Sequence, residues 1–206
     1  MSRIIGTISG CVITEENGRV YFTADADIDA DGANGQNGKP VAYRTDDTGS
    51  EKLSNGGMKI VKGKVICATD DARDIAIQAE DDEPKVFPGG MIASMTWYHY
   101  PGKLLTDPEA YVDAETVPYI VVPPLIIQRT IGVVCGCLAR ATYRGKFVDC
   151  VVADRGGGDK IGELSIAAAR ALGIPSSPRD GGIDEAEVLY ELWPGVAAPG
   201  FELQPA

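Results

Sequence analysis

Apolar and polar residues alternate along three stretches of the chain, and each stretch is interrupted by a residue pair suited to a tight turn. The stretches are CVITEENGRVYF, MKIVKGKVICA and GCLARATYRGKFVDCVVAD, with turns at Asn17-Gly18, Lys62-Gly63 and Arg144-Gly145. Alternation with a period of two on both sides of such a turn predicts a β-hairpin. Because 25 glycines and 13 prolines punctuate the chain, many short strands joined by turns are expected, and the fold class is mainly β.

The run VPYIVVPPLIIQ, residues 117–128, is almost continuously apolar. Such a run is typical of a buried strand, and a strand cannot continue regularly through two prolines. We therefore predict a strand that bends or changes sheet at Pro123-Pro124, as at the corner of a barrel.

Two stretches have the spacing of helices. In GELSIAAARALGI, residues 162–174, leucine and alanine recur on one helical face, and Gly173 marks the end. In TDPEAYVDAE, Asp107 is a candidate N-cap with Pro108 in the first helical position, which predicts one or two turns.

Size and composition predict one soluble globular domain that spans residues 1–206, with 44% hydrophobic residues. The net charge of -11 disfavours nucleic acid as a partner, and it suits a cationic partner or a merely solvated surface. No apolar run is long enough to span a membrane, and the first residues lack a signal-peptide pattern. We expect a monomer that is synthesised in the cytoplasm and acts outside it or in the periplasm.

The five cysteines form no CxxC pair and lie mostly in apolar stretches, which predicts buried free thiols. A zinc site on Cys135, Cys137 and Cys150 would need a fourth ligand, and the single histidine, His99, is distant in sequence. No metal and no cofactor are therefore expected.

Asp154 and Glu163 are the candidate catalytic pair. Asp154 ends the apolar strand VDCVVAD, a glycine run at residues 156–158 follows it, and Glu163 falls in the predicted first helical turn. Glycine lets a ligand approach the backbone closely, and a helix N-terminus favours the ionised form of a carboxylate. By this reasoning Asp154 is the proton donor and Glu163 the base of an acid/base hydrolysis. The structural alternative is a helix cap beside an ordinary turn.

The segment TADADIDADGANGQNGKPVAYR contains four aspartates at alternate positions, Asp25, Asp27, Asp29 and Asp31. In an extended strand they share one face and repel one another, so a positive group is expected nearby. A cationic amino sugar would fit. Calcium is an alternative, because three of these aspartates copy the start of an EF-hand loop, although Gly38 stands where that loop needs Glu. An internal network with Arg44, or a turn in which the aspartates cap their own backbone, is the structural alternative.

Trp97 and Tyr98 in SMTWYHYPG are candidates for stacking on sugar rings. Aromatic residues at strand spacing also build hydrophobic cores, so this segment only supports the hypothesis.

Together these segments resemble glycoside hydrolase family 75, the chitosanases. The resemblance covers roughly residues 21–194 and is carried by DADIDADG, PVAYRTDDTG, AETVPYIVVP, RGKFVDCVVAD and KIGELSIAAARALGI. It implies an endo-acting, inverting hydrolase of the β-1,4 linkages of chitosan, without a cofactor, whose essential acids fall on Asp154 and Glu163. It also implies Glu163 as donor and Asp154 as base, opposite to the helix-dipole argument, so the roles stay exchangeable. The chain departs from secreted fungal members in lacking a signal peptide and in the loop between the two acids.

The stretch ADRGGGDKIGELSIAAARALGI is also similar to the double-psi β-barrel of expansin-like proteins and peptidoglycan lytic transglycosylases. This similarity implies a six-stranded double-psi β-barrel-like core with added hairpins and short helices. It also implies the alternative functions, which are cleavage of peptidoglycan and non-catalytic binding to the cell wall.

Overall fold

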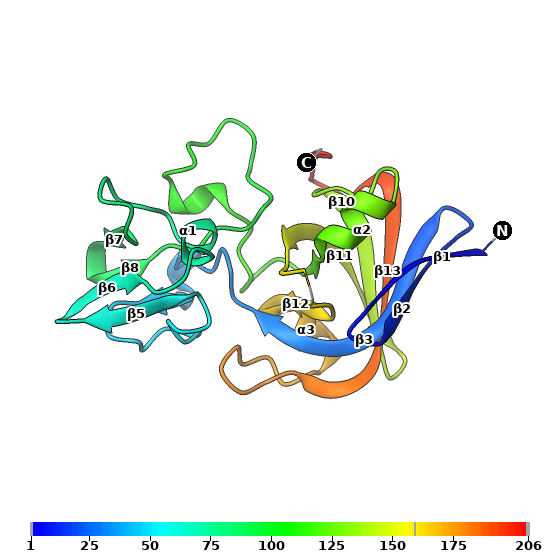
Figure 1. Ribbon diagram of the computed structural model, residues 1–206, viewed down its shortest axis with the longest axis horizontal. Coiled ribbons are helices and arrows are strands. Elements are labelled where there is room, and N and C mark those ends of the chain that lie inside the picture. The colour runs from blue at the N-terminus through cyan, green and yellow to red at the C-terminus, as the bar shows by residue number, and fades with distance from the viewer. Residues whose placement is uncertain (1, 159, 205–206) are drawn as a thin grey trace.

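Six strands close into a β-barrel because strand β3 pairs with a neighbour on both of its edges. They are β3 (Arg19–Asp29), β9 (Tyr119–Val122), β10 (Cys137–Tyr143), β11 (Lys146–Arg155), β12 (Glu163–Ser165) and β13 (Ile183–Ala197). In the order β3-β12-β9-β11-β10-β13 each strand bonds to the next, and β13 pairs back onto β3. The pairs β3–β12 and β9–β11 are parallel, and the other four are antiparallel. The computed structural model, which describes residues 2–158 and 160–204, thus confirms the mainly β, six-stranded barrel fold with added hairpins and short helices (Figure 1).

All three predicted hairpins are present. Strand β2 (Cys11–Glu16) turns into β3, β5 (Met58–Val61) turns into β6 (Lys64–Cys67), and β10 turns into β11. The turn residues Asn17-Gly18, Lys62-Gly63 and Arg144-Gly145 all have positive φ, as tight hairpin turns require. Strand β1 (Ser2–Ile8) extends this sheet by pairing with β2.

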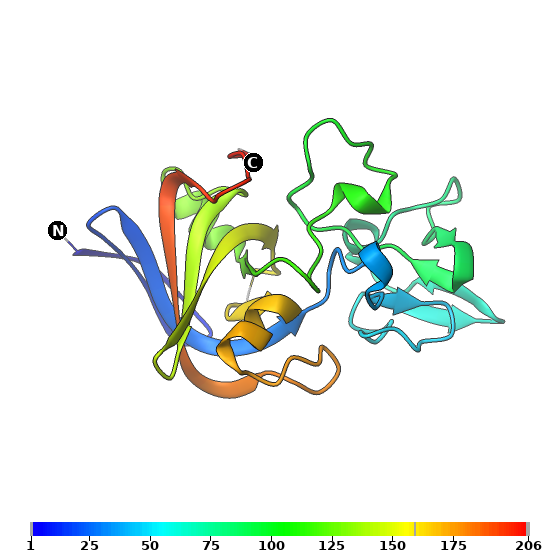
Figure 2. The same cartoon turned by 180° about the vertical axis from the view of Figure 1, so that it is seen from behind.

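Residues 30–118, between β3 and β9, form a second lobe beside the barrel (Figures 1 and 2). This insertion contains short elements only: β4 (Tyr43–Arg44), β5, β6, α1 (Ala72–Ile75), β7 (Val86–Phe87), β8 (Met91–Ile92) and three 3-10 turns at Gln36–Gly38, Pro88–Gly90 and Pro108–Ala110. Tyr43, Leu53 and Met58 of the insertion belong to the same hydrophobic cluster as the barrel interior. The core is thus continuous between the lobes. A single cooperative unfolding transition would show that the chain forms the one domain predicted.

The barrel interior is built by the period of two in β3. Val20, Phe22, Ala24 and Ala26 are buried inside, whereas the odd-numbered residues lie on the outer face. This alternation sends the side chains of Asp25 and Asp27 to the outside of the barrel.

Two predicted elements are corrected by the structure. The run 117–128 is not one bent strand, because β9 ends at Val122 and helix α2 (Pro124–Arg129) begins at the second proline. Proline fits the first helical position, where its missing N–H has no partner to lose. The helix predicted to hold Glu163 in its first turn begins after that residue, since α3 spans Ile166–Leu172 with Ser165 as its N-cap. The predicted cap at Asp107 is confirmed. It starts a 3-10 helix of one turn, Pro108–Ala110.

Candidate active site

Asp154 and Glu163 lie on the two strands that flank β9, and both are in register with the same residue, Val121. Asp154 faces Val121 across the parallel β11–β9 pair, and Glu163 faces it across the antiparallel β12–β9 pair. Glu163 is also in register with Asp27 of β3. Residues in register point to the same side of a sheet, so Asp27, Glu163, Val121 and Asp154 form one row across the outer face of the barrel.

A β-bulge at Ala153 brings Asp154 to this face. The pairing advances from Val152–Ile120 to Asp154–Val121 with Ala153 as the extra residue. In an unbroken ladder Ala153 would face Val121, and Asp154 would turn toward the barrel interior. The bulged residue is held from the insertion, because its carbonyl accepts a hydrogen bond of 2.8 Å from the N–H of Tyr98.

The carboxylate of Asp154 is buried and fixed by two backbone donors. Its Oδ1 accepts hydrogen bonds from the N–H of Trp97 at 2.9 Å and from the N–H of Arg155 at 2.7 Å. Asp154 retains only 8% of its accessible surface. Donors of this kind favour the ionised form of a carboxylate.

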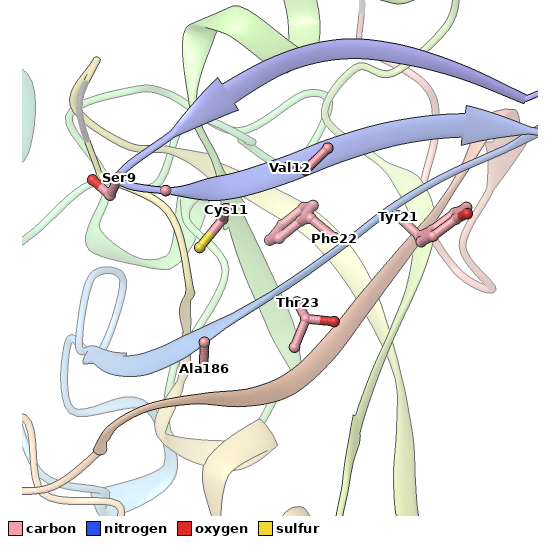
Figure 3. A pocket seen from close by; sticks show the side chains of 8 residues that line it. Ser9, Cys11, Val12, Tyr21, Phe22, Thr23 and Ala186 are labelled. Atoms are coloured by element: carbon pink, nitrogen blue, oxygen red, sulfur yellow. The ribbon is translucent and has the colours of Figure 1, made fainter.

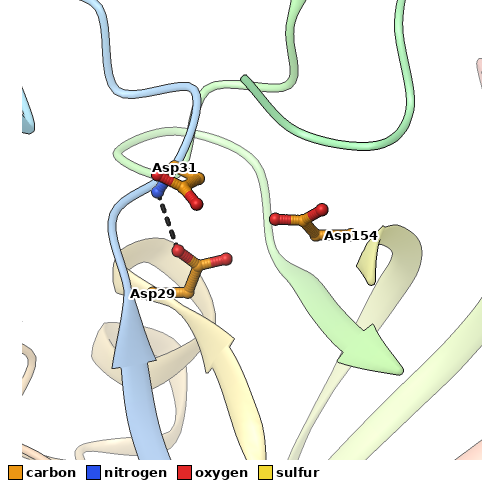
Figure 4. A group of neighbouring side chains, drawn as sticks. All are labelled: Asp29, Asp31 and Asp154. Carbon is orange, nitrogen blue, oxygen red and sulfur yellow. Dashed lines mark hydrogen bonds between the residues drawn. The ribbon is translucent and has the colours of Figure 1, made fainter. Parts of the chain in front are cut away.

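Asp29 and Asp31 join Asp154 in one cluster, in which an oxygen of each carboxylate lies within 4.8 Å of the others (Figure 4). Asp29 Oδ1 accepts from the N–H of Asp31 at 2.8 Å. The hydroxyl of Tyr119 lies 2.9 Å from Asp29 Oδ2 and 3.0 Å from the carbonyl oxygen of Asp31. The end of β3 and the first residues of the insertion thus bring two further acids to Asp154.

Burial raises the pKa of every acid in this group, and repulsion by neighbouring carboxylates raises it further at Asp31, Asp154 and Glu163. The pKa values of Asp154 and Glu163 lie well above the usual range because both carboxyls are desolvated and both face Asp29. The pKa of Asp31 is also raised well above its usual range, by burial and then by the charges of Asp29 and Asp154. At least some of these carboxyls therefore keep a proton near neutral pH.

Glu163 is not at a helix N-terminus, so the argument that a helix dipole makes it the base is wrong. It lies in β12, where burial, Asp29 and Asp154 raise its pKa and Lys160 opposes them. Asp154, by contrast, receives two backbone hydrogen bonds that lower its pKa. Both pKa values nevertheless stay well above the usual range, and the two hydrogen bonds to Asp154 are what distinguishes the acids.

The loop between the two acids leaves room beside them. A Cβ on Gly156 would lie 3.3 Å from Val121 and 3.6 Å from Glu163 Oε2. At Gly157 and Gly158 a Cβ would meet nothing within 4 Å. Gly162, directly before Glu163, has φ of +96°, and a Cβ there would lie 2.1 Å from Asp25 Oδ1. Glycine is therefore required at residue 162 and not at residues 157 and 158.

The four aspartates of the Asp-rich segment do not act as one set. Asp29 and Asp31 join the Asp154 cluster, whereas the side chains of Asp25 and Asp27 lie outside it on the barrel surface. The pKa of Asp25 is raised, first by partial burial and then by the charge of Asp27. Arg44, the predicted internal partner, instead pairs with Asp46 at 3.7 Å.

Of the two aromatic candidates, only Trp97 is available to a ligand. Trp97 is 48% exposed, and the guanidinium of Arg155 lies 4.9 Å from its ring centroid. Tyr98 is 1% exposed and packs edge-on against Tyr100 and Phe201, so the prediction that it binds substrate is wrong. Consecutive residues of an extended segment point to opposite sides, and the sequence did not indicate which side is buried.

Sequence reasoning missed Glu51, Tyr43 and Tyr119, which surround the cluster. Glu51 is buried, and desolvation raises its pKa to about 7. Tyr43 and Tyr119 are buried, and their pKa values are raised well above normal, by desolvation and then by the cluster acids. Glu51 comes from the insertion and no motif marks it, whereas Tyr43 and Tyr119 lie in the quoted segments PVAYRTDDTG and AETVPYIVVP, where only their position beside the cluster reveals a role for them.

Within residues 2–158 and 160–204, Asp29, Asp31 and Asp154 are the residues whose oxygens are close enough together to share one cation. The EF-hand alternative is not supported, because Asp27 lies outside the cluster and no helix flanks the segment in the described chain. The five cysteines are free thiols, with Cys135, Cys137 and Cys150 buried as expected. In the same part of the chain no helix is long and apolar enough to cross a membrane.

Two hollows lie away from the carboxylate row. One of about 460 Å³ lies between β2, β3 and β13 and is lined by small and apolar residues with Cys11 and Tyr21 (Figure 3). The other, of about 260 Å³, lies in the insertion beside Tyr100, Tyr111 and Asp113. None of the described acids lines the first hollow, and in the second Glu109 is paired with Lys103 at 3.0 Å, so the carboxylate row remains the best candidate site.

No known protein-family model matches the chain, and neither does any curated protein. The geometry of this site and the sequence resemblance are therefore the grounds on which a function is proposed.

Proposed function

We propose that the protein is an endo-acting, inverting glycoside hydrolase that cleaves the β-1,4 glucosamine linkages of chitosan with Asp154 and Glu163. The observation that carries this proposal is the shared register of the two acids with Val121, on the same outer face of the barrel. Two strand spacings of about 4.8 Å separate their backbones by roughly 10 Å. Inverting enzymes hold their carboxyls about 6.5–9.5 Å apart, with a water between them, and side chains that lean toward each other from this distance suit that gap.

In the proposed mechanism Glu163 donates its proton to the glycosidic oxygen as the bond to the anomeric carbon breaks. A water attacks the opposite face of the sugar, and Asp154 accepts a proton from it. The raised pKa of Glu163, caused first by burial, keeps the donor protonated. The two backbone N–H groups on Asp154 favour the ionised base.

The surroundings of the acids favour a cationic polysaccharide. Asp27 extends the row beyond Glu163 and is exposed, and Asp25 precedes it on the same face of β3. Trp97, exposed beside Asp154, offers an aromatic face to a sugar ring. The net charge of -11 attracts the ammonium groups of glucosamine over a longer range. The resemblance to family 75 chitosanases supports the same substrate.

Replacement of either acid by its amide tests the proposal. Asp154→Asn and Glu163→Gln are nearly isosteric, and each should reduce reducing-end release from chitosan by about 10²–10⁴-fold. Asp149→Asn is the matched control, because Asp149 lies on the same strand but is exposed and paired with Arg140. Proton NMR of the first product should detect the inverted anomer. Normal turnover in either amide variant would reject the assignment.

The same proteins distinguish the alternatives. If the protein clears purified peptidoglycan sacculi but leaves chitosan intact, it is a peptidoglycan-cleaving enzyme. Co-sedimentation with either polymer without release of sugar would make it a non-catalytic wall-binding barrel.

A further inference from the structure

Asp31 differs from its two neighbours in the cluster because no donor reaches its buried oxygen. Asp29 accepts hydrogen bonds on both oxygens, and Asp154 accepts two on Oδ1. Oδ1 of Asp31 is buried without a hydrogen-bond partner. An ionised carboxylate can only accept, whereas a protonated one can also donate. The donors are thus placed for two anions at Asp29 and Asp154, and Asp31 is the member that suits a proton.

Three ionised carboxylates within 4.8 Å would repel one another strongly in a buried site. A proton or a cation can relieve this repulsion. Calcium takes six to eight oxygen ligands, and magnesium needs a near-ideal octahedron. Here three side chains converge, and both oxygens of Asp29 and Oδ1 of Asp154 already accept hydrogen bonds. This arrangement favours a proton over a metal ion.

We propose that Asp31 is a positioning residue that carries a proton and donates it in a hydrogen bond within the cluster, so that Asp154 stays ionised and oriented as the base. The assignment of the proton to Asp31 stands on the hydrogen-bond pattern of the cluster. Its effect on turnover rests on the proposed function.

The groups that face Asp31 come from every element packed around it, and four of these six are carboxylic acids. They are Asp29 of β3, Asp154 of β11, Glu163 of β12, Glu51 and Tyr43 of the insertion, and Tyr119 of β9. Two cations of the described chain lie near these acids: Lys160 faces Asp29 and Glu163, and Arg179 faces Glu51. The pKa of Asp31 is raised by burial and then by Asp29, Asp154, Glu163 and Glu51, which supports its retaining the proton.

Infrared difference spectroscopy locates this proton without any need for activity. The spectrum of wild type minus Asp31→Asn at pH 7 should contain the C=O stretch of a protonated carboxyl group. Wild type minus Asp149→Asn should contain only ionised carboxylate bands, because Asp149 is exposed and paired. Circular dichroism should show that both variants are folded. If they are, absence of the protonated-carboxyl band from the wild type minus Asp31→Asn spectrum would overturn the assignment.

The pH profile of chitosan hydrolysis tests the effect on Asp154. If Asp31 is neutral, Asp31→Asn preserves charge and a donor, so kcat should stay within about threefold with an unmoved alkaline limb. Asp31→Ala removes the donor, and kcat should fall about 10- to 100-fold. If Asp31 is ionised, the amide removes a negative charge, the pKa of Glu163 falls, and the alkaline limb moves to lower pH. That shift would contradict the inference.

Two further outcomes separate the competing explanations. Calcium, magnesium or manganese that raises the melting temperature of wild type but not of Asp31→Asn would overturn the inference in favour of a cation site. A wild type that shows the protonated band but hydrolyses no glycan would reject the proposed function and would still place the proton on Asp31.

Discussion

The backbone N–H of Trp97 donates a hydrogen bond of 2.9 Å to Oδ1 of Asp154. Trp97 belongs to the insertion and Asp154 to the barrel, so this bond fixes the candidate base to both lobes. The next residue, Tyr98, bonds through its N–H to the carbonyl of the bulged Ala153. One segment of the insertion therefore positions both Asp154 and the bulge that presents it.

Replacement of the Trp97 side chain should weaken substrate binding without disturbing Asp154. Trp97→Ala keeps the backbone N–H and removes the exposed ring, so KM for chitosan oligomers should rise about 3- to 10-fold at nearly constant kcat. Tyr98→Phe is the neighbouring control, since Tyr98 is buried and its hydroxyl accepts from the N–H of Glu202. Equal KM values for Trp97→Ala and wild type would exclude Trp97 from the substrate site.

Glu51 should make the protein less stable at alkaline pH. Its folded pKa is raised from 4.5 to about 7, mainly by desolvation. The stability linked to its proton is fully present below pH 4.5 and is lost as pH rises through 7. Glu51→Gln keeps an acceptor for Lys52 and Asn55. Its free energy of unfolding at pH 9 should therefore exceed that of wild type by up to about 3 kcal/mol. Urea unfolding at pH 4 and pH 9 measures this.

The exposed Glu80 provides the control for this titration. Glu80→Gln should change the free energy of unfolding little at either pH. An advantage of Glu51→Gln that is as large at pH 4 as at pH 9 would show that the effect does not come from the ionisation of Glu51.

Loss of the Tyr119 hydroxyl should destabilise the fold through Asp29. The hydroxyl lies 2.9 Å from Asp29 Oδ2, and Tyr119 is fully buried. Tyr119→Phe leaves a buried carboxylate oxygen without its donor, and the free energy of unfolding should fall by about 1–3 kcal/mol. Denaturant titration measures the change, and Tyr21→Phe on the partly exposed outer face of β3 is the control. A change no larger than in that control would mean that the bond contributes nothing measurable.

Alanine at residue 162 should disrupt the site, whereas alanine at residue 157 should be tolerated. The new Cβ at Gly162 would overlap Asp25 Oδ1, and its φ of +96° strains any other residue. Gly162→Ala should lower the free energy of unfolding by at least about 1 kcal/mol. Gly157→Ala meets open space in the same loop. Thermal melts compare them, and similar melting temperatures would refute the steric requirement.

Salt should weaken the capture of a cationic substrate. The protein carries a net charge of -11, which attracts ammonium groups. Dissolved salt screens this attraction, and at 0.1 M ionic strength it is weak beyond about 10 Å. KM for chitosan should rise several-fold between about 0.02 and 0.5 M salt, at nearly constant kcat. A soluble substrate with acetylated amines serves as the neutral control, and an equal salt effect on both substrates would argue against charge attraction.

The predictions that succeeded depended on local rules. Asn17-Gly18, Lys62-Gly63 and Arg144-Gly145 adopt the positive φ values of hairpin turns because few other residues tolerate them. The end of strand β11 at Asp154-Arg155 and the cap at Asp107 follow equally from neighbouring residues. Helix α3 lies where the spacing predicts a helix, but it begins after Glu163, because Ser165 rather than an earlier residue is its cap.

The sequence by itself determined the mainly β class, the hairpins and the place of Asp154 at the end of a strand, because turn chemistry and alternation act over a few residues. Only the tertiary structure decided which side chains meet. The Ala153 bulge sets the face of Asp154, Tyr98 is turned into the core, and Asp29 and Asp31 are separated from Asp25 and Asp27. These outcomes depend on strand register and on contacts between residues more than 50 positions apart, and such contacts leave no periodic signal in the chain.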